Sequence, residues 1–396
     1  MKQRMTVNHA LTLAILNAII VRAGNVVLAL YALDLGASPV VIGTLAMTFS
    51  AIPTVLSWAT GRMADRFGAR WLLIAGAAGA GAGVLAPYLI GGLPSAFISA
   101  MLIGSSFAIY NVSLQNLVGV LSSQNERARS FANFSLMMSL SRFIGPLIAG
   151  FSVDHFGHID SFFYIGLMSV GPLFMAVTTE NNRPAEKKAE GRQSGGGLRH
   201  MLKNTEIRRT LVTSSLMHMT QDLFQFYLPV YAHAAGLSAS VIGIVLALNA
   251  AAAFVVRSLI PKFLARWSED GLLMRSFFLG AFSIMLVPFT HNAWVLGMVA
   301  FIFGLGTGCG GPVITMLMFS HSAEGRSGEA LGLRMTVNHI SRVIGPLAMG
   351  VIGSAFGLTA IFLGTAGLLG IGGAVSRAGE KSAASRKRQP PPHDAR

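Results

Sequence analysis

The sequence has few charged residues and a single cysteine. Only 12% of its 396 residues are Asp, Glu, Lys or Arg, about half the share of an average soluble protein, which argues against a soluble enzyme and a disordered chain. Cys309 has no second cysteine with which to form an intramolecular disulfide, so a disulfide scaffold is excluded. In contrast, 53% of the residues are hydrophobic and 45 are glycine, which membrane helices tolerate because small residues let helix backbones approach closely. The composition therefore predicts one large body in a lipid bilayer.

Acidic residues are also scarce, which leaves a net charge of +14. In a soluble chain this charge would suggest nucleic-acid binding. Here the basic residues form short clusters between apolar segments, with no basic run interleaved with aromatic residues. Such clusters mark the cytoplasmic side of a membrane protein, so no nucleic-acid partner is expected.

The apolar segments predict an all-α membrane protein with twelve transmembrane helices, because about 20 mostly apolar residues cross the hydrocarbon core of a bilayer. The predicted spans are residues 9–33, 38–60, 71–90, 95–119, 130–153, 160–178, 209–233, 238–259, 271–290, 293–318, 328–353 and 357–376. They form two six-helix bundles, residues 1–178 and 209–376. A charged and glycine-rich stretch, 179–208, is expected to be a cytoplasmic linker, and 377–396 a disordered tail that lacks large apolar residues.

The basic residues predict the orientation. No Lys or Arg lies in the alternate loops near 34–37, 91–94, 154–159, 234–237, 291–292 and 354–356. The positive-inside rule therefore places both termini in the cytoplasm. The first apolar stretch is too long for a signal peptide and is interpreted as the first span, which fits a multi-pass protein of a bacterial inner membrane.

The two halves repeat at an offset of 200 residues. Residues 141–150 read SRFIGPLIAG and residues 341–350 read SRVIGPLAMG, identical at seven of ten positions. Residues 36–43, GASPVVIG, match 236–243, GLSASVIG, at five of eight. The chain is therefore predicted to be a duplicated, pseudo-symmetric six-helix unit, and parallel repeats of this kind place a substrate site at their interface near the bilayer midplane.

The loop after the second span resembles the signature G-x-L-A-D-R-x-G-R-K of the major facilitator superfamily. Gly61, Asp65, Arg66, Gly68 and Arg70 match it, while a methionine replaces the leucine and the last basic pair is reduced to one arginine. In that family the glycines permit a tight turn, and the aspartate meets a helix N-terminus across the interface and helps hold one conformation shut. The resemblance covers the whole chain and implies a secondary transporter that works by alternating access.

Gly145 and Pro146 resemble the G-P-x-x-G-G motif of proton-coupled exporters in this family, although Ala149 replaces one glycine. The pair recurs as Gly345 and Pro346. The alternative interpretation is a packing kink, because proline removes a backbone hydrogen bond and glycine allows close contact. The arginine that drug exporters carry in the fourth span is absent, since residues 95–119 hold no charge.

No motif predicts an enzyme or a cofactor. The run from Gly306 to Gly311 contains G-x-G-x-x-G, but a dinucleotide site needs a preceding strand, and this run lies inside the tenth span. There is no P-loop, so ATP is not expected to drive transport. We find no cluster of His, Asp or Glu with the spacing of metal ligands, and expect no metal.

Four charges lie near the middle of predicted spans, where a charge is costly and faces a cavity or a partner. They are Arg22, Arg142, Asp222 and Arg342. The 200-residue offset relates Arg22 to Asp222 and Arg142 to Arg342. We expect a salt bridge between Arg22 and Asp222, either within the cavity or merely docking the halves. Arg142 and Arg342 could alternatively bond carbonyls freed by the following prolines.

Further polar residues share helix faces with these charges, because residues three or four apart stack on one side of a helix. This spacing predicts a second group of substrate-binding residues: Asn25, Tyr110, Asn111, Gln115, Gln225 and Asn338. His218 and His339 lie one turn from Asp222 and Arg342 and could relay protons, since imidazole titrates near neutral pH. Each histidine could equally be a neutral hydrogen-bond donor in a packed interface.

Three arginines against one aspartate favour an anionic substrate, because arginine suits bidentate recognition of carboxylate or phosphate. Arg142 and Arg342 would clamp the anion from opposite halves, and Asp222 would couple transport to protons. The sequence thus predicts a monomeric, proton-coupled exporter of a small organic anion. The alternatives are a multidrug exporter of lipophilic compounds and an importer of organic acids or other metabolites. A sensor would need a soluble domain that the chain does not offer.

Overall fold

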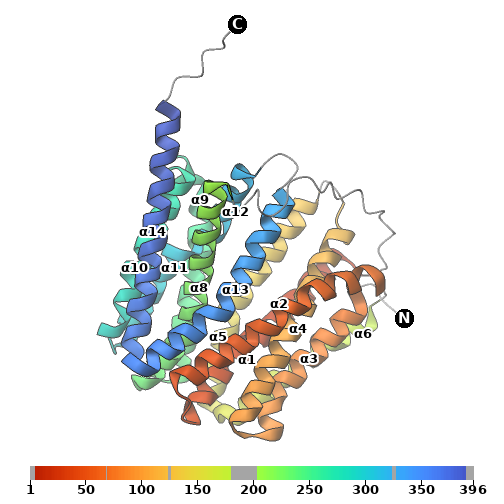
Figure 1. Cartoon of the computed structure of the whole chain (residues 1–396). Helices are drawn as coiled ribbons and strands as arrows, with labels where there is room; N and C mark the ends of the chain where they lie inside the picture. The colour runs from red at the N-terminus through yellow and green to blue at the C-terminus, as the bar shows by residue number, and fades with distance from the viewer. Residues whose placement is uncertain (1–4, 68, 124–125, 180–202, 323–326, 389–396) are drawn as a thin grey trace.

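The computed structural model describes residues 5–67, 69–123, 126–179, 203–322 and 327–388, and these are almost entirely helical. The first half contains α1 (Val7–Asp34), α2 (Pro39–Phe67), α3 (Ala69–Ile90), α4 (Gly92–Leu121), α5 (Arg127–Leu167) and α6 (Val170–Thr178). The second contains α8 (Thr205–Ala234), α9 (Ala239–Leu264), α10 (Glu269–Met285), a short 3-10 turn (Val287–Phe289), α11 (Ala293–Gly308), α12 (Gly310–His321), α13 (Ser327–Phe356) and α14 (Leu358–Arg388). The two bundles lie side by side, the first in red to yellow and the second in green to blue (Figure 1).

The all-helical membrane fold is confirmed. Nine helical segments among the described residues are long and apolar enough to cross a membrane, so the number twelve stays a prediction. The difference arises because the fifth and sixth predicted spans share one segment, 129–178, the described apolar part of the second is short (Pro39–Ile52), and the seventh, in α8, is not among the nine. The helix α5 runs on from the fifth predicted span into the sixth across a bend at Gly157, where φ is 77°. The tenth span is divided into α11 and α12 at Cys309.

The segment boundaries differ from the prediction at two places. The tail expected to be disordered from residue 377 instead continues α14 to Arg388. Its Ala, Glu, Lys and Arg residues are strong helix formers, and extending an existing helix avoids the cost of nucleation. Glu380 also pairs with Arg275 at 3.8 Å. The helix α8 begins at Thr205, and most of the predicted linker lies outside the described residues.

Several helices of the second half begin at residues whose side chains cap the first turn. Ser238 accepts a hydrogen bond from the Val241 amide, and Asn204 accepts from Glu206 and Ile207. Short polar side chains satisfy amides that have no partner within the helix. These residues explain why α8 and α9 begin where they do.

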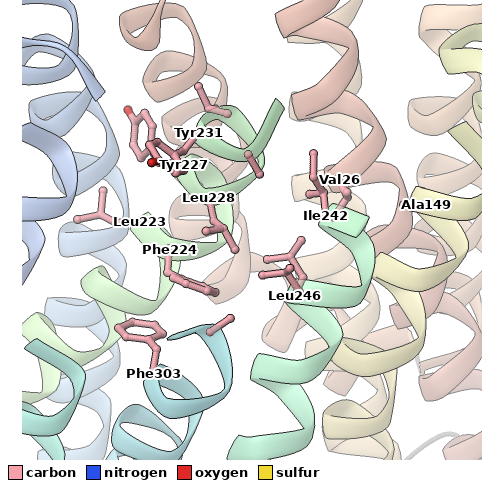
Figure 2. Close-up of a cluster of buried hydrophobic side chains, with 14 of the residues drawn as sticks. Val26, Ala149, Leu223, Phe224, Tyr227, Leu228, Tyr231, Ile242, Leu246 and Phe303 are labelled. Carbon is pink, nitrogen blue, oxygen red and sulfur yellow. The ribbon is translucent and has the colours of Figure 1, made fainter. Parts of the chain in front are cut away.

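One buried apolar cluster extends across both halves (Figure 2). Phe224 of α8 and Phe303 of α11 stack with ring centroids 4.5 Å apart. Ile242 of α9 belongs to the same cluster as Val26 of α1 and Ala149 of α5. The two bundles are therefore joined by side-chain packing.

The Gly-Pro motifs pack against glycines of the opposite half, where α5 meets α9 and α13 meets α2. A β-carbon at Gly243 would lie 2.4 Å from the carbonyl oxygen of Pro146, and one at Gly43 would lie 2.5 Å from that of Pro346. Both contacts are related by the 200-residue repeat. The close approach supports the packing interpretation of the motif, and its role in export stays untested.

Hydrogen bonds also join the halves at one end of the bundle, formed by residues 34–39, 154–158, 234–240 and 354–358. We call this the outer end, because the basic residues predict that it faces away from the cytoplasm. The two carboxylate oxygens of Asp154 accept from the amides of Ala239 (2.9 Å) and Ser240 (2.8 Å) at the start of α9. At the repeat-related position, the Ser354 hydroxyl accepts from the Val40 amide at 3.2 Å. A carboxylate thus caps one inter-half contact and a neutral hydroxyl the other.

The close contact at Gly243 predicts the effect of adding one methyl group. Gly243→Ala should lower the unfolding free energy by about 1–3 kcal/mol, because its new β-carbon meets rigid backbone and the halves must move apart. The measurement is thermal unfolding of the purified protein. Gly370→Ala is the matched control, since no atom lies within 4 Å of that position; equal stability of the two variants would contradict the close-packing argument.

The Asp154 cap predicts a shift in conformation. Asp154→Ala should favour opening of the outer end by about 1 kcal/mol, or about fivefold, as for other exposed N-caps. A cysteine introduced at the cavity residue Asn249, in a Cys309→Ser background, would report this as faster reaction with a membrane-impermeant thiol reagent added from outside. Ser354→Ala removes one neutral bond and should have a smaller effect. An unchanged rate in Asp154→Ala would show that the cap does not hold the outer end closed.

Candidate functional site

A cavity of about 60 Å³ lies where the two halves meet. Its lining comes from α1, α5, α8, α9, α11 and α13. Most of the lining residues are polar or charged, in contrast to the composition of the chain. The polar members are Arg22, Ser139, Arg142, Gln221, Asp222, Gln225, Asn249, Arg257, Thr307 and Arg342, and the apolar members are Leu246, Ala250, Ala253 and Phe303.

Helical periodicity places these polar residues on shared faces. Asp222 and Gln225 are three residues apart on α8, and Ser139 and Arg142 are three apart on α5. All four line the cavity. The structure therefore brings together Arg22, Arg142, Asp222, Gln225 and Arg342 of the residues predicted from the sequence.

The single acid of the cavity pairs with Arg342. Its Oδ2 lies 2.9 Å from the Arg342 Nε, and neither atom has a hydrogen-bond partner of good geometry, so the contact is chiefly electrostatic. The predicted pair between Arg22 and Asp222 is wrong. Asp222 and Arg342 both belong to the second half, in which α8 packs directly against α13. This ion pair stabilises one half and does not dock the two together.

Arg22 and Arg142 have no acidic partner among the described residues. The Nε of Arg22 is buried without a hydrogen bond, and its guanidinium carbon lies 5.7 Å from the centre of the Phe107 ring. Arg142 is exposed even though α5 crosses the bilayer at this point. Because it lines the cavity, its exposed surface faces that space, so Arg142 remains available to a ligand.

Arg257 is a cavity residue that the sequence analysis missed. Its Nε donates to the Gly308 carbonyl (3.0 Å), and its terminal NH1 donates across the interface to the Ser139 hydroxyl (2.8 Å). The Gly308 carbonyl is available because α11 ends there. Arg257 lies in the last turn of the predicted span 238–259 and so resembled an interfacial residue. Leu259 and Ile260, which follow it, were the signal that α9 continues.

Other predicted binding residues are not among the lining residues of this cavity. Tyr110 is 1% exposed and packs against Gly76 between α3 and α4. The Gln115 side-chain amide donates to that of Asn111 at 3.3 Å. Asn25 borders a separate space of about 10 Å³.

Asn338, His218 and His339 are likewise not among the described lining residues of the cavity. The Asn338 amide oxygen accepts from the Ser214 hydroxyl at 2.9 Å. The His218 Nδ1 lies 2.9 Å from the Ser214 carbonyl oxygen. Both contacts belong to the packing of α8 in the second half, while His339 is half-buried. Their roles in substrate binding and proton relay stay predictions.

The motif that follows the second predicted span lies only partly within the described residues. The helix α2 includes Gly61, Asp65 and Arg66, but their side chains and surroundings lie outside the described part of the chain, as does Gly68. Arg70 donates to the Val177 carbonyl at 2.6 Å and so ties the start of α3 to the end of α6. The predicted contact of Asp65 across the interface stays untested.

Within the described part of the chain, no three His, Cys, Asp or Glu side chains are grouped so that they could hold a metal ion. The chemistry that the cavity offers is therefore that of four guanidinium groups, one carboxylate and several amides. Such a site can bind an anion and can exchange one proton.

Comparisons with known proteins agree with this architecture. A sequence model described as Major Facilitator Superfamily matches residues 10–346 and, in a second alignment, 272–394. The "Multidrug resistance protein MdtG" of Dickeya zeae is 22% identical over 337 residues, covering 83% of this chain and 81% of that protein. The "Quinolone resistance protein NorA" of Staphylococcus aureus is 23% identical over 348 residues, covering 82% and 84%.

Two solved structures have the same fold at low sequence identity. The crystal structure of the nucleoside transporter NupG superimposes with a TM-score of 0.78 at 13% identity, covering 94% of this chain and 99% of that one. A bacterial homologue of the lysosomal transporter Spinster, in an inward-facing and unoccupied conformation, gives a TM-score of 0.78 at 12% identity, with coverage of 97% and 98%.

The observed ion pair predicts a specific energetic coupling. Asp222→Asn and Arg342→Gln should be non-additive in a double-mutant cycle on the unfolding free energy, with a coupling of about 1 kcal/mol, since both side chains are partly exposed to the cavity. The corresponding cycle with Arg22→Gln should give less than half that value. A larger coupling to Arg22 would restore the pair expected from the sequence.

Proposed function

The chain belongs to the major facilitator superfamily, and we propose that it is a proton-coupled transporter that exports a small organic anion. The observation that supports the substrate is the pair of cavity arginines, Arg22 and Arg142, for which the described residues provide no ion pair, since Asp222 of the same cavity pairs with Arg342. A cation inside the membrane is costly without a counter-charge. A bound anion would supply that counter-charge.

Transport would follow from rocking of the two halves about the cavity. The repeat supports this proposal, because parallel repeats place the substrate site at their interface. The contacts of Asp154 and Ser354 join the halves at the outer end, and we infer that they hold this end closed. An anion would enter from the opposite end and leave after these contacts break.

Asp222 would couple transport to protons. Protonation would neutralise its carboxylate and end its pairing with Arg342, so a third arginine would become available to the substrate. Anion binding and proton binding should therefore strengthen each other. His218 and His339 are the other titratable groups near this pair, one helical turn away on α8 and α13.

Export is supported by the names of the two relatives described above, a multidrug and a quinolone resistance protein. The membrane potential, negative inside, also drives anions outward, by about 2.3 kcal/mol per charge and 100 mV. We further propose that the protein is a monomer of the cytoplasmic membrane with both termini inside, on the distribution of basic loops.

Those relatives also favour a second candidate, a multidrug exporter of lipophilic compounds. The cavity offers such molecules little apolar surface, since ten of its fourteen lining residues are polar or charged. The four arginines would moreover repel a lipophilic cation. We therefore place this function second.

The coupling role of Asp222 predicts a pH effect. In the wild type, sulfate and lactate, whose charges stay constant near neutral pH, should bind more tightly as the pH falls, because protonation of Asp222 frees Arg342. Asp222→Asn should bind them tightly at every pH and should transport them without moving protons. Calorimetry and a pH-sensitive dye in proteoliposomes measure the two effects.

The histidines provide the control for this experiment. The double variant His218→Gln and His339→Gln should keep the pH dependence of binding if Asp222 is the titrating group. Loss of the pH dependence in this double variant, with retention in Asp222→Asn, would move the coupling role to the histidines.

A further inference from the structure

The repeat places two equivalent pairs of residues at equivalent helix contacts, but with different charges. In the second half, α8 packs against α13 and brings Asp222 to Arg342. In the first half, α1 packs against α5 in the same way, and the residues at the matching positions are Arg22 and Arg142. One pair of positions holds an ion pair, and the matching pair holds two cations.

The backbone at this contact brings the two cations together. A β-carbon at Gly145 would lie 2.5 Å from the β-carbon of Arg22, so the absence of a side chain at Gly145 lets Arg22 pack directly on α5. Arg142 lies three residues before Gly145 and therefore on the same helix face. Both side chains line the cavity.

The remaining cations of the cavity already have partners within the protein, an acid in one case and neutral oxygen atoms in the other. Arg342 has Asp222, and Arg257 has two directed hydrogen bonds, to Gly308 and Ser139. Arg22 and Arg142 have neither an acid nor a hydrogen bond among the described residues. The two cavity cations that have neither an ion pair nor a hydrogen bond are thus Arg22 and Arg142, on α1 and α5.

The size of the cavity restricts the ligand further. About 60 Å³ accommodates roughly four to six water molecules, since each needs about 10–15 Å³ by this measure. A ligand that replaces this water has a similar number of non-hydrogen atoms. Drug-sized pockets are several times larger.

Building on the proposed anion transport, we propose that the substrate is a compact dianion, held by Arg22 and Arg142 in the place that a carboxylate occupies in the second half. Both charges of such a molecule are needed, because a monoanion leaves one arginine uncompensated. The dianion also agrees with export. With one proton bound it keeps a net negative charge that the membrane potential drives outward, whereas a monoanion with one proton is neutral.

The experiment compares anions that differ in one property at a time. Oxalate and oxamate have the same shape and differ by one charge. Sulfate tests a tetrahedral dianion of the same size, and adipate tests a longer dicarboxylate. Binding of each to the purified full-length protein in lipid nanodiscs is measured by calorimetry at neutral pH.

We expect oxalate or sulfate to bind about tenfold or more tightly than oxamate, and adipate to bind less tightly than oxalate, because each charge on the ligand compensates a separate arginine. Preference for oxalate or for sulfate would identify a planar or a tetrahedral head group. Arg142→Gln, at an exposed side chain, should abolish the preference for oxalate over oxamate, and Arg22→Gln should do the same. Arg275→Gln removes a cation that is paired outside the cavity with Glu380 and should leave the preference intact.

Failure of this inference and failure of the proposed function give different results. Equal affinities for oxalate and oxamate would overturn the dianion and leave an anion transporter. Tighter binding of adipate would overturn the compact substrate. Binding of lipophilic cations with no binding of any anion would overturn both proposals.

Discussion

The structure depends on how four guanidinium groups are accommodated between helices that cross a membrane. Each must be hydrated, paired or hydrogen-bonded, because an isolated charge in a medium of low dielectric constant is strongly destabilised. Asp222 compensates Arg342, and backbone and hydroxyl oxygens compensate Arg257. Arg22 and Arg142, on α1 and α5, have neither kind of partner among the described residues, and both line the polar cavity.

Around this cavity the halves are held together by two different kinds of contact. Glycine-to-carbonyl contacts, at Gly43 and Gly243, bring helix backbones within van der Waals distance, and such packing can separate without breaking any charged interaction. The Asp154 cap is directional and charge-assisted, and no equivalent carboxylate exists at Ser354. The outer end is therefore symmetric in packing and asymmetric in hydrogen bonding. As a result, the contact between α5 and α9 is stronger than the contact between α13 and α2.

The sequence predicted the helices and the charged residues of the cavity, because both depend on local properties. Hydropathy identifies a span, and the 200-residue repeat relates Arg142 to Arg342. The sequence did not predict that Asp222 pairs within its own half, since repeat symmetry relates positions and does not say which helices touch. Arg257 was missed because one additional helical turn moved it from the membrane interface into the cavity. Tyr110 has a hydroxyl group of the kind that binds substrates, but the packing of α3 against α4 places this residue in the core.

Duplication explains why a charge is missing on one side of the cavity. Two copies of one six-helix unit begin with the same contact between their first and fifth helices, so any residue pair at that contact occurs twice. An acid and an arginine at both contacts would let each half form its own ion pair. Here Arg22 stands where the other half has Asp222, so one half forms its ion pair and the other has two arginines at the matching positions. A single change of charge within a symmetric fold thus separates a paired contact from an unpaired one, and the proposed anion would bind at the unpaired one.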